Sequence, residues 1–253
     1  MDNPAQPSHF RKFGLPLIIA ALGVIAGMAW QSYRAALNPA GSLASGQRAA
    51  IEAVVHDYLL EHPEVLPKAL ENLQQKQNAA QLAGIRTDLE TPWPGEVLGN
   101  PQGKVTLVEF TDFACTYCRR SVEDVDALVA ANPDLKVVVR QLPILTPESA
   151  DAARMGMAAA AQGKYAAFHK AMFAAGRPDA QSIQAAAQAA GVDLARAKAV
   201  TDDPLTEQAL AKNLDYARQL GINGTPSWVI GDTMLSGAVG REKLAEAIAA
   251  ARG

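Results

Sequence analysis

The stretch VTLVEFTDFACTYC, residues 105–118, joins a short apolar run to two cysteines that lie three positions apart. Val105–Phe110 is rich in β-branched side chains, a composition that predicts a buried strand. A helix is expected from about Cys115 to Ala131, and a second strand at residues 135–140 (LKVVVR). The two cysteines therefore lie where a strand ends and a helix begins.

This placement has a chemical consequence for the cysteine pair. Backbone N–H groups and the dipole at a helix N-terminus stabilise an anion, so the pKa of the first thiol should fall. The thiolate is the species that attacks a disulfide. We therefore expect Cys115 to be the nucleophile and Cys118, nearly one turn later, to be the resolving thiol. Together they would form a redox-active disulfide. A structural bridge across so short a loop would contribute only about 2 kcal/mol.

Two other interpretations of the pair are weaker. Half of a zinc site would need a second C-x-x-C or paired histidines, but the histidines are scattered singly, at His9, His56, His62 and His169. Inert buried cysteines are disfavoured by this spacing directly after a strand. We therefore expect neither a metal nor a cofactor.

The rest of the chain after residue 97 follows an α/β pattern. Thr146-Pro147 is a good helix start, and helical patterns continue to residue 220. Strand patterns return at 227–230 and 233–235, and a last helix is expected at 241–250. This order predicts one sheet with a helical insertion at 146–220. An aromatic stripe in the insertion is interpreted as core, with a peptide-binding groove as the alternative: Tyr165, Phe168, His169, Met172 and Phe173.

The N-terminal region predicts a membrane anchor. Residues 13–30 carry no charge and as a helix would span about 27 Å, close to the thickness of a bilayer core. A cleaved signal peptide is the alternative. Arg11 and Lys12 precede the span, which places residues 1–12 in the cytoplasm as a tail and the rest of the chain outside. The net charge of −3 gives no reason to expect nucleic-acid binding.

Between the span and the α/β domain lie a linker and a helical segment. Residues 31–46 read as linker. Residues 47–90 contain two helical patterns with apolar stripes, separated at His62-Pro63. These helices have too little core to stand alone. They could fold back on the main domain or pair with copies of themselves in a homo-oligomer.

The motif at 105–118 resembles the active-site region of the DsbA-like branch of the thioredoxin superfamily. The stretch GTPSW at 224–228 is similar to that family's cis-proline loop, and the resemblance covers residues 97–253. The helical segment resembles that of the Com1 and ScsC types. The resemblance implies a thioredoxin-like fold, with a cis bond before Pro226 and with Thr225 facing the cysteines to bind an extended peptide. Thr116 and Tyr117, between the cysteines, would also contact the substrate.

The resemblance also implies a role for Glu109, six residues before Cys115. It matches the family's buried acid, which would accept or relay the proton of Cys118. A glutamate in solvent at the strand end is the alternative. Tyr117 departs from the family's strongest oxidant, which carries His there. Tyr supplies no positive charge, and Arg119 could compensate in part.

These patterns together predict a protein disulfide oxidoreductase with a thioredoxin-like catalytic domain at 97–253. It would be held in the cell inner membrane by one span, with its catalytic domain in the periplasm. Its expected partners are cysteine-containing extracytoplasmic proteins and a membrane redox partner. Whether it acts as oxidase, isomerase or reductase is left open by the sequence. The alternative function is a chaperone-like binder of unfolded envelope proteins with a secondary redox role.

Overall fold

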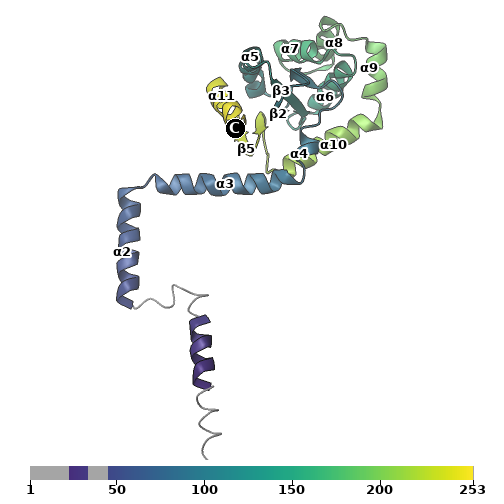
Figure 1. Ribbon diagram of the computed structural model, residues 1–253. Coiled ribbons are helices and arrows are strands. Elements are labelled where there is room, and N and C mark those ends of the chain that lie inside the picture. The colour runs from purple at the N-terminus through teal and green to yellow at the C-terminus, as the bar shows by residue number, and fades with distance from the viewer. Residues whose placement is uncertain (1–22, 34–44, 253) are drawn as a thin grey trace, which may run out of the picture. The chain divides into compact units, whose positions relative to one another are not determined.

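The computed structural model describes residues 23–33 and 45–252 (Figure 1). The chain divides into two compact units, one ending at Ala69 and the other beginning at Leu70. The second unit contains the sheet and both cysteines.

The second unit is built on a five-stranded sheet in the order β1-β3-β2-β4-β5. Central β2 and β3 are parallel and are joined through α5, whereas the other neighbouring strands pair antiparallel. The elements are β1 Val97–Gly99, β2 Val105–Thr111, α5 Thr116–Ala131, β3 Leu135–Gln141, β4 Ser227–Ile230 and β5 Thr233–Ser236. The predicted strand–helix–strand start and the closing strand pair are confirmed. The edge strand β1 is an addition, because three residues carry too little pattern to be recognised.

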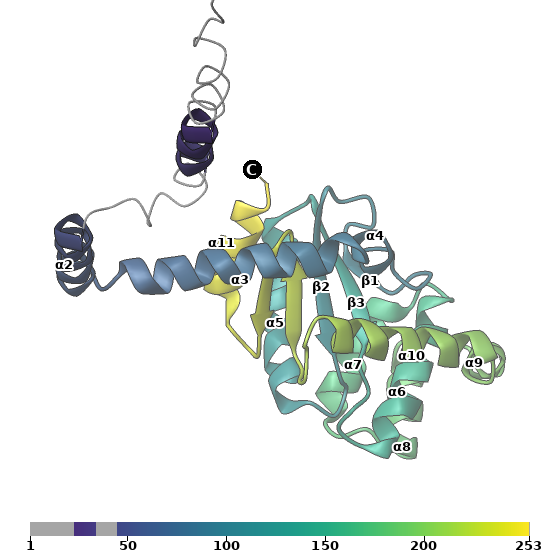
Figure 2. The same cartoon turned by 90° about the horizontal axis from the view of Figure 1, so that it is seen from below.

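Both faces of the sheet are covered by helices (Figure 2). On one face, α5 and α11 pack over Leu107 and Val137. On the other face, α10, α4 and the end of α3 pack over Val108 and Val138. The bounds are α3 Val65–Ala83, α4 Arg86–Leu89, α10 Pro204–Gln219 and α11 Arg241–Ala250. Burial on both faces explains the near-continuous apolar sequence of β2 and β3.

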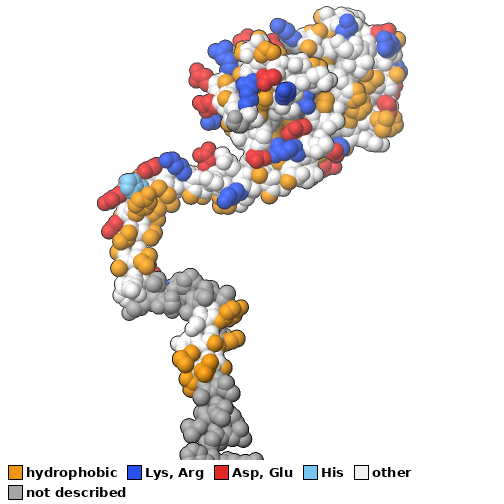
Figure 3. Space-filling view, in the orientation of Figure 1, with side chains coloured by type: hydrophobic (Ala, Val, Ile, Leu, Met, Phe, Trp, Pro, Cys, Tyr) orange, Lys and Arg blue, Asp and Glu red, His pale blue; other side chains and the backbone are white. Residues whose placement is uncertain are grey.

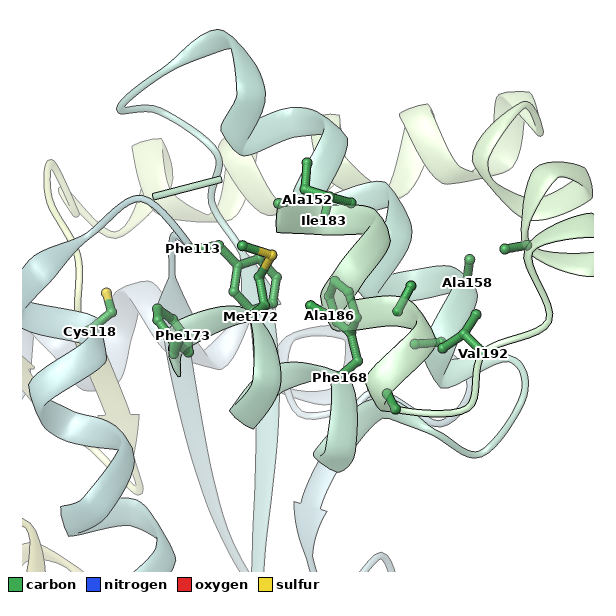
Figure 4. Close-up of a cluster of buried hydrophobic side chains, with 14 of the residues drawn as sticks. Phe113, Cys118, Ala152, Ala158, Phe168, Met172, Phe173, Ile183, Ala186 and Val192 are labelled. Atoms are coloured by element: carbon green, nitrogen blue, oxygen red, sulfur yellow. The ribbon is translucent and has the colours of Figure 1, made fainter. Parts of the chain in front are cut away.

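Five helices occupy the predicted insertion at 146–220: α6 Pro147–Ala160, α7 Tyr165–Ala175, α8 Ala180–Ala189, α9 Leu194–Thr201 and α10, which packs on the sheet. Thr146 and Ser149 form a capping box at the start of α6, as the Thr-Pro pair suggested. The aromatic stripe is buried, since Phe168 is 0% and Phe173 is 2% exposed, so its interpretation as core is confirmed. Phe113 and Phe173 belong to the same apolar cluster as Cys118 (Figure 4).

The first unit contains the helix at residues 23–33 and α2 Ser45–Glu61. Most of its described apolar side chains are exposed, as the orange side chains along α2 show (Figure 3). Within the part of the chain that the structure describes, no helix is long and apolar enough to cross a membrane. Of the span predicted at 13–30, residues 13–22 lie outside the described residues, as does the predicted tail at 1–12.

Candidate active site

Cys115 is the N-cap residue of α5, as the strand-to-helix position suggested. Its sulfur accepts a hydrogen bond from the backbone N–H of Cys118 at 3.4 Å. Its thiol donates to the backbone carbonyl of Thr225 at 3.2 Å. Residues 110 positions apart in the chain are thereby brought into direct contact. Both cysteines are free thiols, so the geometry is that of the reduced site.

The turn that carries Cys115 is fixed by Asp112, a residue that the sequence reasoning missed. The carboxylate of Asp112 accepts hydrogen bonds from the backbone N–H groups of Ala114, Ile144 and Leu145. Its backbone carbonyl accepts from the N–H of Cys115 at 2.9 Å. Asp112 therefore ties the end of β2 to the chain that follows β3. A short polar residue between a strand and a helix start was the available sequence signal.

The surroundings of Cys115 favour its thiolate. The hydrogen bond from the Cys118 thiol, followed by the nearby Thr225 side chain and the backbone N–H groups of Cys118 and Tyr117, lowers the pKa of Cys115 to about 5 against the opposing effect of burial. These donors lie around the N-terminus of α5, where the helix dipole also favours an anion. A thiol with this pKa is ionised at neutral pH and can attack a disulfide.

The surroundings of Cys118 have the opposite effect. Burial, then the hydrogen bond to Cys115 and the charge of Glu109, raise the pKa of Cys118. The Cys118 side chain is 0% exposed and faces, from α5, the aromatic cluster that includes Phe173 of the insertion (Figure 4). Cys118 therefore stays protonated until a base takes its proton.

Glu109 lies close enough to Cys118 for its charge to act on that thiol, and it can therefore serve as this base. It lies on β2 and is 2% exposed, so the alternative of a solvent-exposed glutamate is wrong. Burial, with the negative charge of Cys115, raises the pKa of Glu109 to about 8. A carboxyl with this pKa can both accept and release a proton near neutral pH.

The loop that carries Pro226 lies against the sulfur of Cys115. The Thr225–Pro226 peptide bond is cis, as the resemblance implied. The loop leads directly into β4, where Ser227 pairs with Phe110 and Trp228 with Glu109. This register places the loop beside the end of β2, so the two predicted motifs meet.

The dipeptide between the cysteines points outward. Thr116 and Tyr117 are exposed, Tyr117 by 58%, and the guanidinium of Arg120 lies 5.6 Å from the Tyr117 ring centre. Arg119 was expected to make up for the missing positive charge beside Cys115. That expectation stays a prediction, because Arg119 is not among the groups described above that lower the pKa of Cys115. Within residues 23–33 and 45–252, no three acidic, histidine or cysteine side chains are grouped as a metal site would need.

A strand-to-helix cysteine pair facing a cis-proline loop defines a dithiol site of the thioredoxin class. The sequence profile of the DSBA-like thioredoxin domain matches residues 106–249, and the chain belongs to this family. A second profile, that of the N-terminal domain of the copper resistance protein ScsC, matches residues 47–80.

Solved structures agree with this assignment. A thioredoxin-like oxidoreductase from Silicibacter pomeroyi is 40% identical, with a TM-score of 0.59, and the match covers 62% of this chain and 91% of that one. A linker-deletion mutant of Proteus mirabilis ScsC is 28% identical, with a TM-score of 0.63 and coverages of 83% and 97%. The thiol-disulfide exchange protein alpha-DsbA2 of Wolbachia pipientis is 25% identical, with a TM-score of 0.64 and coverages of 70% and 97%.

The curated relatives that match are much longer proteins, of which the match covers only a part. The Na⁺/H⁺ antiporter NhaA of Herminiimonas arsenicoxydans is 30% identical over 184 residues, which is 69% of this chain and 30% of that protein. An NhaA of Salinispora arenicola is 27% identical over 158 residues, or 24% of its length. The chain thus spans less than a third of these curated relatives.

Proposed function

We propose that this chain is a protein thiol–disulfide oxidoreductase that acts through Cys115 and Cys118 on the cysteines of extracytoplasmic proteins. The observation that carries the proposal is the contrast between the two thiols. Cys115 has a pKa of about 5 and contacts the Thr225 carbonyl, whereas Cys118 is buried with a raised pKa near Glu109. Attack and resolution are thereby divided between two sulfurs.

The reaction runs through a mixed disulfide. The Cys115 thiolate attacks one sulfur of a substrate disulfide, forms an S–S bond to it and releases the other substrate sulfur as a thiolate. Glu109, as carboxylate, then takes the proton of Cys118. The Cys118 sulfur attacks Cys115, which frees the second substrate thiolate and leaves a Cys115–Cys118 disulfide. The substrate gains two electrons and the enzyme loses them. Oxidation of a substrate is the reverse of these steps.

Substrate binding is proposed for the residues around Cys115. The backbone of Thr225 lies beside the attacking sulfur and can pair with an extended peptide. Thr116 and the exposed ring of Tyr117 offer further contact area without buried charge. Pro226 removes one backbone donor from this edge, which leaves the Thr225 groups as the ones that a peptide meets.

The low pKa of Cys115 bears on the direction of electron flow. Stabilising the thiolate stabilises the reduced enzyme, and an enzyme disulfide whose reduced form is stable is a good oxidant of other thiols. This observation favours an oxidase or an isomerase over a reductase. Equilibrating the reduced chain with glutathione buffers and quantifying its disulfide tests the point. A potential as low as that of thioredoxin, about −270 mV, would contradict it.

The activity itself is tested with a disulfide-scrambled secreted protein as substrate. We expect the wild-type chain to restore the native disulfides or to form disulfides in the reduced substrate, and the double variant Cys115→Ala, Cys118→Ala to do neither. Binding of unfolded substrate that survives in the double variant, together with no redox turnover by the wild-type chain, would support the chaperone-like alternative instead.

Anchoring in the inner membrane, with the second unit in the periplasm, remains part of the proposal. It is supported by the uncharged run at 13–30 and by the match to a periplasmic thioredoxin-like protein from Salmonella enterica, 29% identical with a TM-score of 0.61. The full chain should remain in the membrane after carbonate extraction. Release of a shortened chain that begins near residue 35 would show a cleaved signal peptide instead.

Self-association through residues 47–90 is supported by the exposed apolar side chains of α2. Ile51, Val54, Val55 and Tyr58 recur at helical spacing and are each at least 49% exposed. The triple variant Ile51→Glu, Val54→Glu, Val55→Glu should reduce the mass found by light scattering to that of one chain, whereas Glu61→Lys on the same helix should leave it unchanged. Equal masses for wild type and triple variant would contradict the proposal.

A further inference from the structure

A second buried acid lies behind Glu109. Glu96, in the segment before β1, is 1% exposed, and its Oε1 accepts a hydrogen bond from the side-chain amide of Gln141 at 2.9 Å. The same amide nitrogen donates to the hydroxyl oxygen of Tyr165, also at 2.9 Å. Tyr165 is itself 2% exposed. Three side chains from the edge of the sheet, from β3 and from α7 thus form one buried polar row.

The row continues toward the dithiol site. Thr111 and Gln141 pair across β2 and β3, so their side chains share one face of the sheet with Glu109, which lies two residues before Thr111. The negative charges of Glu96 and of Glu109, after burial, both raise the pKa of Tyr165. The Tyr165 hydroxyl therefore lies within the electrostatic reach of both acids.

The hydrogen-bond inventory of the row fixes the direction of one proton. An amide nitrogen only donates, so the hydroxyl oxygen of Tyr165 accepts from Gln141 and its own proton must point elsewhere. Within the described residues, the buried atoms on this side that can accept this proton and have no hydrogen-bond partner are Glu109 Oε2, Thr111 Oγ1 and His169 Nε2, besides Gln141 Oε1 of the amide that already donates to the hydroxyl. Of these, Glu109 is the group whose charge acts on Tyr165. The His169 ring centre lies 5.7 Å from that of Tyr165. Buried polar atoms are almost always paired, directly or through an internal water.

We propose that Glu96, Gln141 and Tyr165 form a positioning array for Glu109, in which Tyr165 directs its hydroxyl proton toward the Glu109 carboxylate and Glu96 sets the charge behind it. The inference rests on the proposed function, because Glu109 matters only where Cys118 must lose its proton. None of the three residues contacts the sulfurs, so they act through Glu109.

Both ends of the array are defined. At one end Glu109 faces Cys118, whose pKa its charge raises. At the other end Glu96 lines a cleft of about 260 Å³ together with Arg140, Asn213 and Tyr216. The ionisable and charged groups that face the array are Cys115 at the N-cap of α5, Cys118 from α5, Tyr165 and His169 from α7, and Arg140 from β3.

The array makes two predictions of opposite sign. Burial raises the pKa of Glu96 to about 8, as it does for Glu109, so the two acids compete to ionise. Glu96→Gln keeps the acceptor for Gln141 but removes the second charge, so the pKa of Glu109 should fall by roughly one unit. Tyr165→Phe removes the donated proton, so the pKa of Glu109 should rise by roughly one unit.

The test is a pH titration of the protonated-carboxyl infrared band of the reduced full chain, with Glu109→Gln identifying the band of Glu109. Tyr216→Phe is the matched control, because it removes another buried tyrosine hydroxyl, one that lies on the other face of the sheet. It should leave the Glu109 midpoint unchanged.

An unchanged Glu109 midpoint in Glu96→Gln overturns the proposal, and so does a shift of the same sign in Glu96→Gln and Tyr165→Phe. If Glu96→Gln fails to fold, the titration of Tyr165→Phe alone is the test. An unchanged Glu109 midpoint in that variant would show that Tyr165 does not act on Glu109. The titration needs no turnover, so exchange with glutathione in the same samples separately reports whether the proposed function holds.

Discussion

The dithiol site has a rim and a floor, and the pKa of a cysteine thiol is lowered at the rim and raised at the floor. The rim consists of Cys115, Thr116, Tyr117 and Thr225, and the floor of Cys118, Glu109 and Thr111. Hydrogen bonds, first from the Cys118 thiol and then from rim groups, lower the pKa of Cys115 to about 5, whereas burial at the floor raises the pKa values of Cys118 and Glu109. About one helical turn thus separates Cys115, which is ionised at neutral pH, from Cys118, which must lose its proton to a base before it can attack.

The largest effects should come from deleting either sulfur. Cys115→Ala should abolish exchange at its first step, because the floor thiol stays protonated and buried. Cys118→Ala should leave the first attack intact and accumulate mixed disulfides with substrates, visible on non-reducing gels. If Cys115→Ala still traps substrates, the roles of rim and floor are reversed.

Removing the acid of the floor should have the next largest effect. Glu109→Gln keeps the size of the side chain but cannot accept a proton, so resolution of the mixed disulfide by Cys118 should slow by about a hundredfold, the lower end of what a general base contributes. Attack by Cys115 should keep its rate. Rapid-quench measurements of both steps give the comparison, with the exposed Glu123→Gln on α5 as control. Equal slowing of both steps would show a general loss of structure.

At the rim, the Thr225 hydroxyl should make a smaller contribution. Thr225→Val keeps the shape of the side chain and the backbone carbonyl but removes the polar hydroxyl beside the thiolate, so the pKa of Cys115 should rise by roughly one unit. Thiolate absorbance as a function of pH measures this shift. Thr233→Val in β5 is the control and should leave the titration unchanged. No shift in Thr225→Val would leave the Cys118 thiol and the backbone amides as the source of the low pKa.

Stability should depend on pH with opposite sign at the rim and at the floor. The folded pKa of Cys115, about 5, lies below its ordinary 9.0, so ionisation stabilises the reduced fold increasingly as pH rises from 5 to 9. The folded pKa of Glu109, about 8, lies above its ordinary 4.5, so ionisation costs stability increasingly between 4.5 and 8.

Melting temperatures of the reduced proteins test this contrast. As pH rises through these windows, Cys115→Ala should lose stability relative to wild type and Glu109→Gln should gain it. Parallel melting curves for all three proteins at every pH would contradict both assignments.

The rim was readable from the sequence, because its signals are local. A β-branched run followed by C-x-x-C at a helix start places Cys115 at an N-cap, and a five-residue motif marks the loop of Thr225. The burial of Glu109 required the resemblance, because helices distant in sequence decide whether a strand residue is covered. The strand β1 and helix α4 were missed because they have three and four residues.

The array behind the floor could not be predicted. Glu96 meets Gln141 across 45 residues, and Gln141 meets Tyr165 across 24, through the pairing of a sheet edge with an inserted helix. None of the three lies in a motif, and Tyr165 reads equally well as core. Contacts of this kind arise from topology rather than from local pattern.

The most direct test of the contrast between rim and floor is the alkylation rate of each cysteine in the reduced full chain, resolved by mass spectrometry as a function of pH. We expect Cys115 to react with a midpoint near pH 5 and Cys118 to remain unmodified through neutral pH. Alkylation of Cys118 before Cys115, or midpoints for both near the ordinary thiol value, would contradict the account.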